Sequence, residues 1–184
     1  MKRTLSQMRG LFWKVFIRAR WRLHPLGKKG AEEGRRAPDF TLRDLSGRAF
    51  TLSHIFPEKG AVLWFTNLCS GCEERIGFLQ KVYEESRDRL EVLAISTLGG
   101  DRATPERIVR DHRIDFPLLL DPEDWLGRVL GFEHPGNACP LYNLLILDRS
   151  GKIRLRSHLS AISDAKFLDA LRSIGLLSEE RRRA

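Results

Sequence analysis

The sequence predicts an α/β fold in which helices flank a central mixed β-sheet. Two apolar runs, residues 61–66 and 90–96, have the composition of buried strands, and residues 70–86 between them have the spacing of a helix. This β-α-β order implies a parallel strand pair with a right-handed crossover. Residues 141–148 and 152–158 flank a turn and predict an antiparallel pair, so the sheet should be mixed.

Shorter elements are expected around these segments. In chain order they are strands at 40–43 and 48–52 around a turn at 44–47, a turn of helix at 53–56, a helix at 104–113, a strand at 116–121, a helix at 123–130 and a closing amphipathic helix at 162–174. Thr104 followed by Pro105 marks a helix start, because proline suits the first helical turn. Trp64 and Trp125 are expected in the core.

Positive charge is concentrated at the N-terminal end of the chain. Residues 1–36 hold eleven Lys and Arg against two acids, a net +9, and residues 37–184 hold the other twenty-one against twenty-two, a net −1. A nearly neutral body argues against nucleic acid as a partner. We expect an arm and linker at 1–36, one folded domain at 37–176 and a charged tail at 177–184.

The arm has the pattern of a basic amphipathic helix. Its apolar residues recur at steps of three and four, and they are Leu5, Met8, Phe12, Val15, Phe16, Ala19 and Leu23. The segment from Met1 to Arg22 is expected to lie on an anionic membrane surface or to dock on a partner protein, or else to fold back on its own domain. No apolar run reaches the roughly 18 residues of a membrane span, and no signal-peptide pattern is present. The expected location is the cytoplasm, either free or peripheral at the inner membrane surface.

A pair of cysteines stands where a strand gives way to a helix. Cys69 and Cys72 enclose Ser70 and Gly71, and unpaired N–H groups at a helix N-terminus favour a thiolate. The spacing predicts a redox dithiol in which Cys69 attacks and Cys72 resolves. A structural zinc half-site is less favoured, because a second pair of ligands is missing.

Several segments resemble, in order, the thioredoxin-like superfamily, specifically the AhpC/TSA and TlpA/ResA-type redoxins, over residues 37–176. The matching segments are 37–42, 44–47 with 52–53, 65–83, 116–121, and 145–148 with 151–153. The resemblance implies a thioredoxin-like fold and a thiol–disulfide oxidoreductase that reduces or exchanges disulfides of proteins or small molecules. It implies no cofactor and no metal.

The resemblance also implies a substrate groove beside the dithiol. Its expected residues are Thr66, Leu68, Ser70, Gly71, Cys139 and Pro140. In the family a cis-proline loop packs against the dithiol, usually six residues before an Asp-x-x-Gly turn. That position is Tyr142 here, whereas Pro140 lies eight residues before Asp148. The Cys139–Pro140 bond is therefore a candidate for the cis bond.

Three alternatives stay open. The first is a thiol peroxidase with Cys69 as the peroxidatic thiol, because residues 66–69 resemble the Thr-x-x-Cys of peroxiredoxins, although Val62 and Tyr142 replace an expected proline and arginine. The second is a non-catalytic Cu(I)-binding module that uses all three cysteines, with His134 nearby; Cys139 can equally be a small buried apolar residue. The third is an interaction protein whose function lies in the N-terminal arm.

Overall fold

The structure is a computed structural model, and it describes residues 31–130, 132, 139–140 and 142–178. The predicted N-terminal helix, His134 and the tail beyond Ser178 lie outside the described residues, so those predictions stay predictions. None of the helices within the described ranges has the length and hydrophobicity that a membrane span requires.

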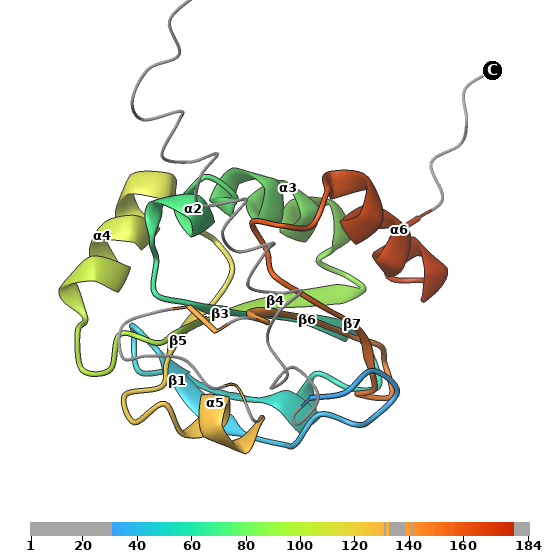
Figure 1. The fold of residues 1–184 in the computed structure, drawn as a ribbon, viewed down its shortest axis with the longest axis horizontal. Helices are drawn as coiled ribbons and strands as arrows, with labels where there is room; N and C mark the ends of the chain where they lie inside the picture. The colour runs from blue at the N-terminus through green and yellow to red at the C-terminus, as the bar shows by residue number, and fades with distance from the viewer. Residues whose placement is uncertain (1–30, 131, 133–138, 141, 179–184) are drawn as a thin grey trace, which may run out of the picture.

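A seven-stranded β-sheet forms the centre of the described part of the chain (Figure 1). Its strands are β1 (Thr41–Asp44), β2 (Ala49–Thr51), β3 (Gly60–Thr66), β4 (Leu90–Ser96), β5 (Leu118–Leu120), β6 (Leu144–Leu147) and β7 (Ile153–Ser157). Their order across the sheet is β2-β1-β5-β4-β3-β6-β7. β3 is parallel to β4 and β4 to β5, whereas β6 runs antiparallel to β3. The prediction of a mixed sheet is confirmed.

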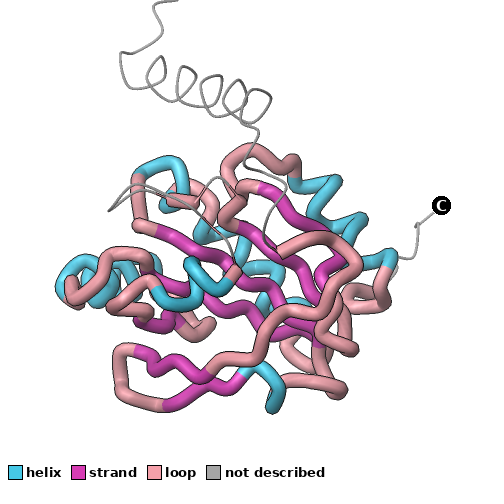
Figure 2. Tube along the Cα trace, turned by 60° about the horizontal axis from the view of Figure 1, so that its bottom comes forward, coloured by secondary structure: helices cyan, strands magenta, loops and turns pink. Residues whose placement is uncertain are grey.

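Helices cover the two faces of the sheet unequally. Helices α2 (Ser70–Glu73), α3 (Ile76–Ser86), α4 (Ala103–His112) and α6 (Asp164–Ser173) lie above the sheet in Figure 1, and the short α5 (Trp125–Val129) lies below it. A 3-10 turn, η2, spans Leu52–His54. The expectation of a buried Trp125 is wrong: it is 44% exposed, whereas Leu126 of α5 and Leu130, which follows α5, are buried instead. The tube in Figure 2 shows the strands side by side between the helices.

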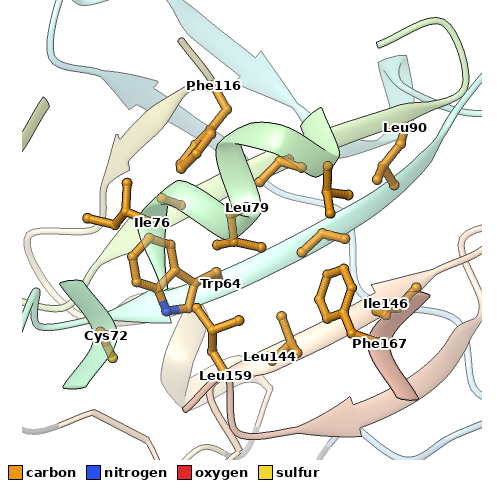
Figure 3. Packing of buried hydrophobic residues seen from close by; sticks show 14 of the residues in the cluster. Trp64, Cys72, Ile76, Leu79, Leu90, Phe116, Leu144, Ile146, Leu159 and Phe167 are labelled. Atoms are coloured by element: carbon orange, nitrogen blue, oxygen red, sulfur yellow. The ribbon is translucent and has the colours of Figure 1, made fainter. Parts of the chain in front are cut away.

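The core lies on both faces of β3, whose seven residues are all buried. Successive side chains of a strand point to opposite faces. Val62 and Trp64 accordingly pack with α3 and α6 in one cluster, shown in Figure 3, and Leu63 and Phe65 pack in a second cluster on the face of α5. Burial on both faces explains why this strand is continuously apolar in the sequence.

Residues 31–36, at the end of the predicted linker, pack on the domain. The N–H of Ala31 donates to the Leu130 carbonyl at 2.9 Å, and the N–H of Gly34 donates to the Ile153 carbonyl at 2.7 Å. Arg36 forms an isolated bridge with Lys152. This part of the segment therefore extends the edge of the sheet beside β7.

The single helix predicted over residues 70–86 is two helices, so that expectation is wrong. The N–H of Arg75 bonds to the Cys72 carbonyl three residues earlier, instead of to the fourth residue back, and this interrupts the α-helical ladder between α2 and α3. The Arg75 side chain stacks on the Phe78 ring, 4.4 Å from the ring centroid, and pairs with Asp164 of α6 at 2.6 Å. The break leaves α2, which carries the dithiol, as one short turn.

Replacing Gly60 with alanine is expected to destabilise the fold by about 1–3 kcal/mol, because a Cβ there would meet the Leu176 side chain and lie 2.6 Å from the Leu147 carbonyl oxygen. The matched control is Gly77→Ala in α3, where a Cβ meets nothing within 4 Å. This control should gain up to about 0.5–1 kcal/mol, since alanine favours helices. Urea denaturation of both variants measures the difference. Equal stabilities would contradict the close approach at Gly60.

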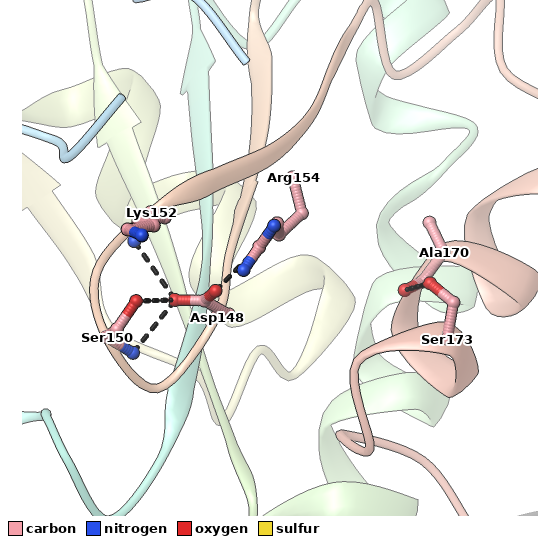
Figure 4. A network of polar contacts seen from close by, with 6 residues as sticks. All are labelled: Asp148, Ser150, Lys152, Arg154, Ala170 and Ser173. Carbon is pink, nitrogen blue, oxygen red and sulfur yellow. Dashed lines mark hydrogen bonds and ion pairs between the residues drawn. The ribbon is translucent and has the colours of Figure 1, made fainter. Parts of the chain in front are cut away.

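The turn between β6 and β7 is organised by one carboxylate (Figure 4). Asp148 Oδ1 accepts the N–H and hydroxyl of Ser150, at 2.8 and 2.7 Å, and the N–H of Lys152 at 3.0 Å, while Oδ2 accepts Arg154 Nε at 2.6 Å. Burial alone would raise the pKa of Asp148, but the hydrogen bonds from Ser150 and Arg154 outweigh it and lower the pKa to about 2. The folded state therefore stabilises the ionised form of this side chain.

Asp148→Asn is expected to cost about 1–2 kcal/mol at pH 7, because the charge-assisted bonds of the carboxylate are lost. Because the pKa of Asp148 is lowered, its ionised form stabilises the folded protein at pH values above the ordinary carboxyl pKa. This stabilisation disappears as the pH falls through about 2. The gap between wild type and variant should therefore shrink from pH 4 downwards in thermal melts. Asp169→Asn, which breaks an exposed pair with Arg172, should change stability by less than about 0.5 kcal/mol at any pH. A stability difference between the wild type and Asp148→Asn that persists unchanged near pH 2 would contradict the lowered pKa of Asp148.

Candidate active site

The predicted attacking cysteine stands at the tight connection between β3 and α2. The backbone of Leu68 is left-handed, with a φ of 54°, and its N–H donates to Thr66 Oγ1 at 2.9 Å. The N–H of Cys69 donates to Asn67 Oδ1 at 3.3 Å. Cys69 is the N-cap of α2, and its carbonyl oxygen accepts the N–H of Cys72 at 2.8 Å. These bonds fix Cys69 at the start of the helix.

Three thiols gather beyond this turn, two from the same turn of chain and the third from 67 residues beyond Cys72. The Sγ atoms of Cys69, Cys72 and Cys139 all lie within 4.8 Å of one another, and those of Cys72 and Cys139 are 3.6 Å apart. All three are free cysteines. Cys72 is fully buried at one end of the core cluster in Figure 3, whereas Cys69 and Cys139 are partly exposed. A substrate therefore meets Cys69 or Cys139 before it meets Cys72.

Two asparagines hold the thiols in place. The Cys139 thiol donates to Asn67 Oδ1 at 2.7 Å, and the Asn67 N–H donates back to Cys139 Sγ at 3.4 Å. Asn143, which is fully buried, donates its side-chain N–H to Cys72 Sγ at 3.7 Å and accepts the Leu159 N–H at 2.8 Å. The sulfurs of Cys139 and Cys72 therefore each accept an N–H group, from Asn67 and Asn143 respectively.

The cluster separates the acidities of its three thiols. Interaction with the Cys139 side chain, and next with the Cys72 side chain, lowers the pKa of Cys69 far below its usual range. The backbone N–H groups of Cys72 and Gly71 act in the same direction but less strongly. Hydrogen bonding to Cys139 and Cys69, together with burial, raises the pKa of Cys72, and hydrogen bonding to Cys69 raises that of Cys139 to about 11. At pH 7 the cluster therefore contains one thiolate, on Cys69, and two thiols.

A buried histidine lies near the cluster. His158 is 4% exposed, and burial lowers its pKa to about 4, although the Cys69 thiolate acts in the opposite direction. Its Nδ1 accepts the N–H of Ser160 at 3.3 Å and lies 2.9 Å from the Ser160 hydroxyl. A neutral ring that accepts at Nδ1 carries its proton on Nε2.

The structure brings the predicted groove residues to one end of the sheet. Ser70 is exposed, Gly71 and Cys139 are partly exposed, and Thr66, Leu68 and Pro140 are buried. The groove itself stays a prediction. The cis bond of the described residues is Phe56–Pro57, so the candidate Cys139–Pro140 bond is not cis.

Three residues of the site were not identified from the sequence. Asn67 stands inside the tetrapeptide 66–69, so its position between strand and dithiol is a signal that sequence reasoning could have used. Asn143 and His158 offer no such signal. Asn143 reaches the cluster through the antiparallel pairing that places β6 beside β3, and His158 follows β7 directly.

The chain matches a family model and several curated relatives. The model described as the AhpC/TSA family matches residues 34–156. The thioredoxin-like protein YneN of Bacillus subtilis is 27% identical over 139 residues, which cover 73% of this chain and 78% of that protein. The thiol-disulfide oxidoreductase ResA of Geobacillus thermodenitrificans is 27% identical over 129 residues, covering 69% and 70%.

Solved structures share the fold. The peroxidoxin BcpB of Mycobacterium tuberculosis superimposes with a TM-score of 0.66 at 22% identity, over 80% of this chain and 99% of that chain. An identity this low supports the fold and says nothing further about chemistry. Together with the relatives, it confirms the prediction of a thioredoxin-like α/β fold.

Proposed function

Because this chain belongs to the AhpC/TSA family, we propose that it is a thiol–disulfide oxidoreductase in which Cys69 is the attacking thiol and Cys72 the resolving thiol. One observation carries the proposal: a partly exposed thiolate lies within 4.8 Å of a buried thiol on the same turn of helix. The thiolate is the reactive form of cysteine, and it is the form that meets solvent here.

The reaction has two steps. The Cys69 thiolate attacks one sulfur of the substrate disulfide, forming a mixed disulfide and releasing the second substrate sulfur as a thiolate, which takes a proton from water. Cys72 then loses its proton and attacks Cys69 Sγ, which forms the Cys69–Cys72 disulfide and releases the first substrate sulfur as a thiolate that takes up a proton. The substrate gains two electrons and two protons; the protein supplies both electrons and the proton of Cys72, and water supplies the other proton.

The shifted acidities suit this order of events. Before the reaction, hydrogen bonding to Cys139 and Cys69 and the charge on Cys69 hold the pKa of Cys72 high, so Cys72 does not compete for substrate. In the mixed disulfide, Cys69 carries no charge. Loss of the Cys69 contributions should then lower the pKa of Cys72, although hydrogen bonding to Cys139 and burial still raise it, so Cys72 becomes more nucleophilic after the first step.

The peroxidase alternative has less support. A hydroxyl that orients peroxide must be accessible to it, but Thr66 is fully buried and its Oγ1 accepts the N–H of Leu68. Disulfide exchange needs no group beyond the thiols. We therefore propose protein or small-molecule disulfides as substrates.

The test is a redox titration of the metal-free protein in glutathione buffers, with free thiols trapped by alkylation and disulfides located by mass spectrometry. The proposal expects a reversible Cys69–Cys72 disulfide with a potential between roughly −120 and −270 mV, the span of thioredoxin-fold oxidoreductases. A pair that never closes would overturn the proposal. Peroxide consumption that depends on Cys69, without exchange of disulfides, would favour the peroxidase.

A further inference from the structure

The two-step exchange uses two of the three clustered thiols. Cys139 forms no bond to sulfur in it, yet its sulfur lies 3.6 Å from that of Cys72 and within 4.8 Å of that of Cys69. Two hydrogen bonds to Asn67, at 2.7 and 3.4 Å, fix the Cys139 side chain in this position. The third sulfur is therefore placed as firmly as the other two.

We propose that Cys69, Cys72 and Cys139 form a three-coordinate thiolate site for Cu(I). Soft thiolate ligands select soft ions, of which Cu(I) is a leading example. If a metal–thiolate bond is about 2.3 Å long, as it is for zinc, three sulfurs around one ion lie about 4 Å apart. The observed separations, 3.6 Å for one pair and at most 4.8 Å for the others, bracket this value. Small side-chain rotations would close the site.

The composition of the cluster favours Cu(I) over zinc. Structural zinc sites almost always have four tetrahedral ligands. Within the described residues, the group of potential ligands around these sulfurs contains the three cysteines alone. His158 is near the cluster but is not among these potential ligands, although either of its ring nitrogens could have qualified. Three sulfurs without a fourth ligand match an ion that accepts three-coordinate geometry.

The surroundings provide the outer shell that a thiolate site needs. The Asn67 N–H donates to Cys139 Sγ, and the Asn143 side chain donates to Cys72 Sγ. Both groups remain donors when the thiol protons leave, and such donors orient and stabilise metal ligands. Cys72 is buried, while Cys69 and Cys139 are partly exposed, so water is largely excluded but an ion can reach the sulfurs.

Binding involves no transfer of electrons. Each protonated thiol releases its proton to water as it forms a bond to the ion, and copper stays Cu(I) throughout. A Cys69–Cys72 disulfide ties up two of the ligands, so the site exists only in the reduced protein. Copper binding and disulfide exchange are therefore mutually exclusive states of the same cluster, although neither requires that the other occur.

The test uses the reduced full-length chain under anaerobic conditions, titrated with Cu(I) in competition with a chromogenic Cu(I) chelator. The expected result is one Cu(I) per chain, with three sulfur neighbours in X-ray absorption spectra. Cys139→Ser should reduce the sulfur neighbours from three to two. Loss of an outer-shell partner typically weakens metal binding 10- to 100-fold, so loss of this ligand should weaken it at least about ten-fold.

Two further variants sharpen the test. Cys139→Ala should reproduce the serine result, and Ser160→Ala, which alters only the partner of His158, should bind as the wild type does. Two sulfur neighbours in the wild-type protein, or equal affinities of the wild type and both Cys139 variants, would overturn the proposal. Disulfide exchange is measured separately on the metal-free protein, so failure of the copper site and failure of the exchange activity are distinguishable.

Discussion

Cys69→Ser is expected to lower the rate of disulfide reduction at least about a thousand-fold, because serine provides no thiolate for the first attack. Cys72→Ser should behave differently. It keeps the attacking thiol, and in a simple two-cysteine enzyme it would trap the mixed disulfide with the substrate. In this protein, Cys139 Sγ lies within 4.8 Å of Cys69 Sγ and can release the substrate in place of Cys72.

A durable mixed disulfide is therefore expected only in the double variant Cys72→Ser/Cys139→Ser. The measurement is intact-mass spectrometry after mixing each variant with a disulfide-bonded peptide. The double variant should hold about one peptide per chain, whereas the Cys72→Ser variant should release the peptide and form a Cys69–Cys139 disulfide. If the single variant retains the peptide as long as the double variant does, Cys139 does not reach Cys69 in solution.

The sequence predicts the central elements well because their signals are local. The apolar run before the dithiol and the helical spacing after it depend on residues adjacent in the chain. The sequence does not predict the break at Arg75, because the break accompanies a contact with Asp164, 89 residues away. The hydrophobicity of Trp125 favours the core, but the orientation of α5 exposes this side chain.

Some residues of the candidate site have a local sequence signal, and others do not. Cys69 and Cys72 are recognisable from their spacing, and the resemblance to redoxins predicts that Cys139 lies near them. Neither source predicts that Cys139 has the strongest influence on the pKa of Cys69, because that depends on the position at which Asn67 holds its thiol. The buried asparagine directly before β6, Asn143, has no local signal at all. Such contacts follow from strand pairing, which single-sequence patterns do not specify.

The lowered pKa of Cys69 should be visible as a nearly flat pH profile of alkylation. A thiol of ordinary pKa, about 8.5, loses several hundred-fold of its reactivity between pH 8 and pH 5, because the thiolate disappears. Cys69 keeps its thiolate in this range, so its rate of reaction with iodoacetamide should change less than about two-fold. Peptide mass spectrometry measures the rate at each pH. A several-hundred-fold decline would contradict the lowered pKa.

The cause of the shift is testable with Cys139→Ala. This change removes the largest contribution to the low pKa of Cys69 and leaves that of Cys72 in place. The pKa of Cys69 should rise, and the acid limb of the alkylation profile should move to higher pH. The Gly71 N–H also lowers the pKa of Cys69, but less strongly, and a side-chain substitution cannot remove it. The informative comparison is therefore between the wild type and the variant that lacks the Cys139 thiol. If the profile of Cys139→Ala stays as flat as that of the wild type, the backbone at the start of α2, rather than the third thiol, maintains the thiolate.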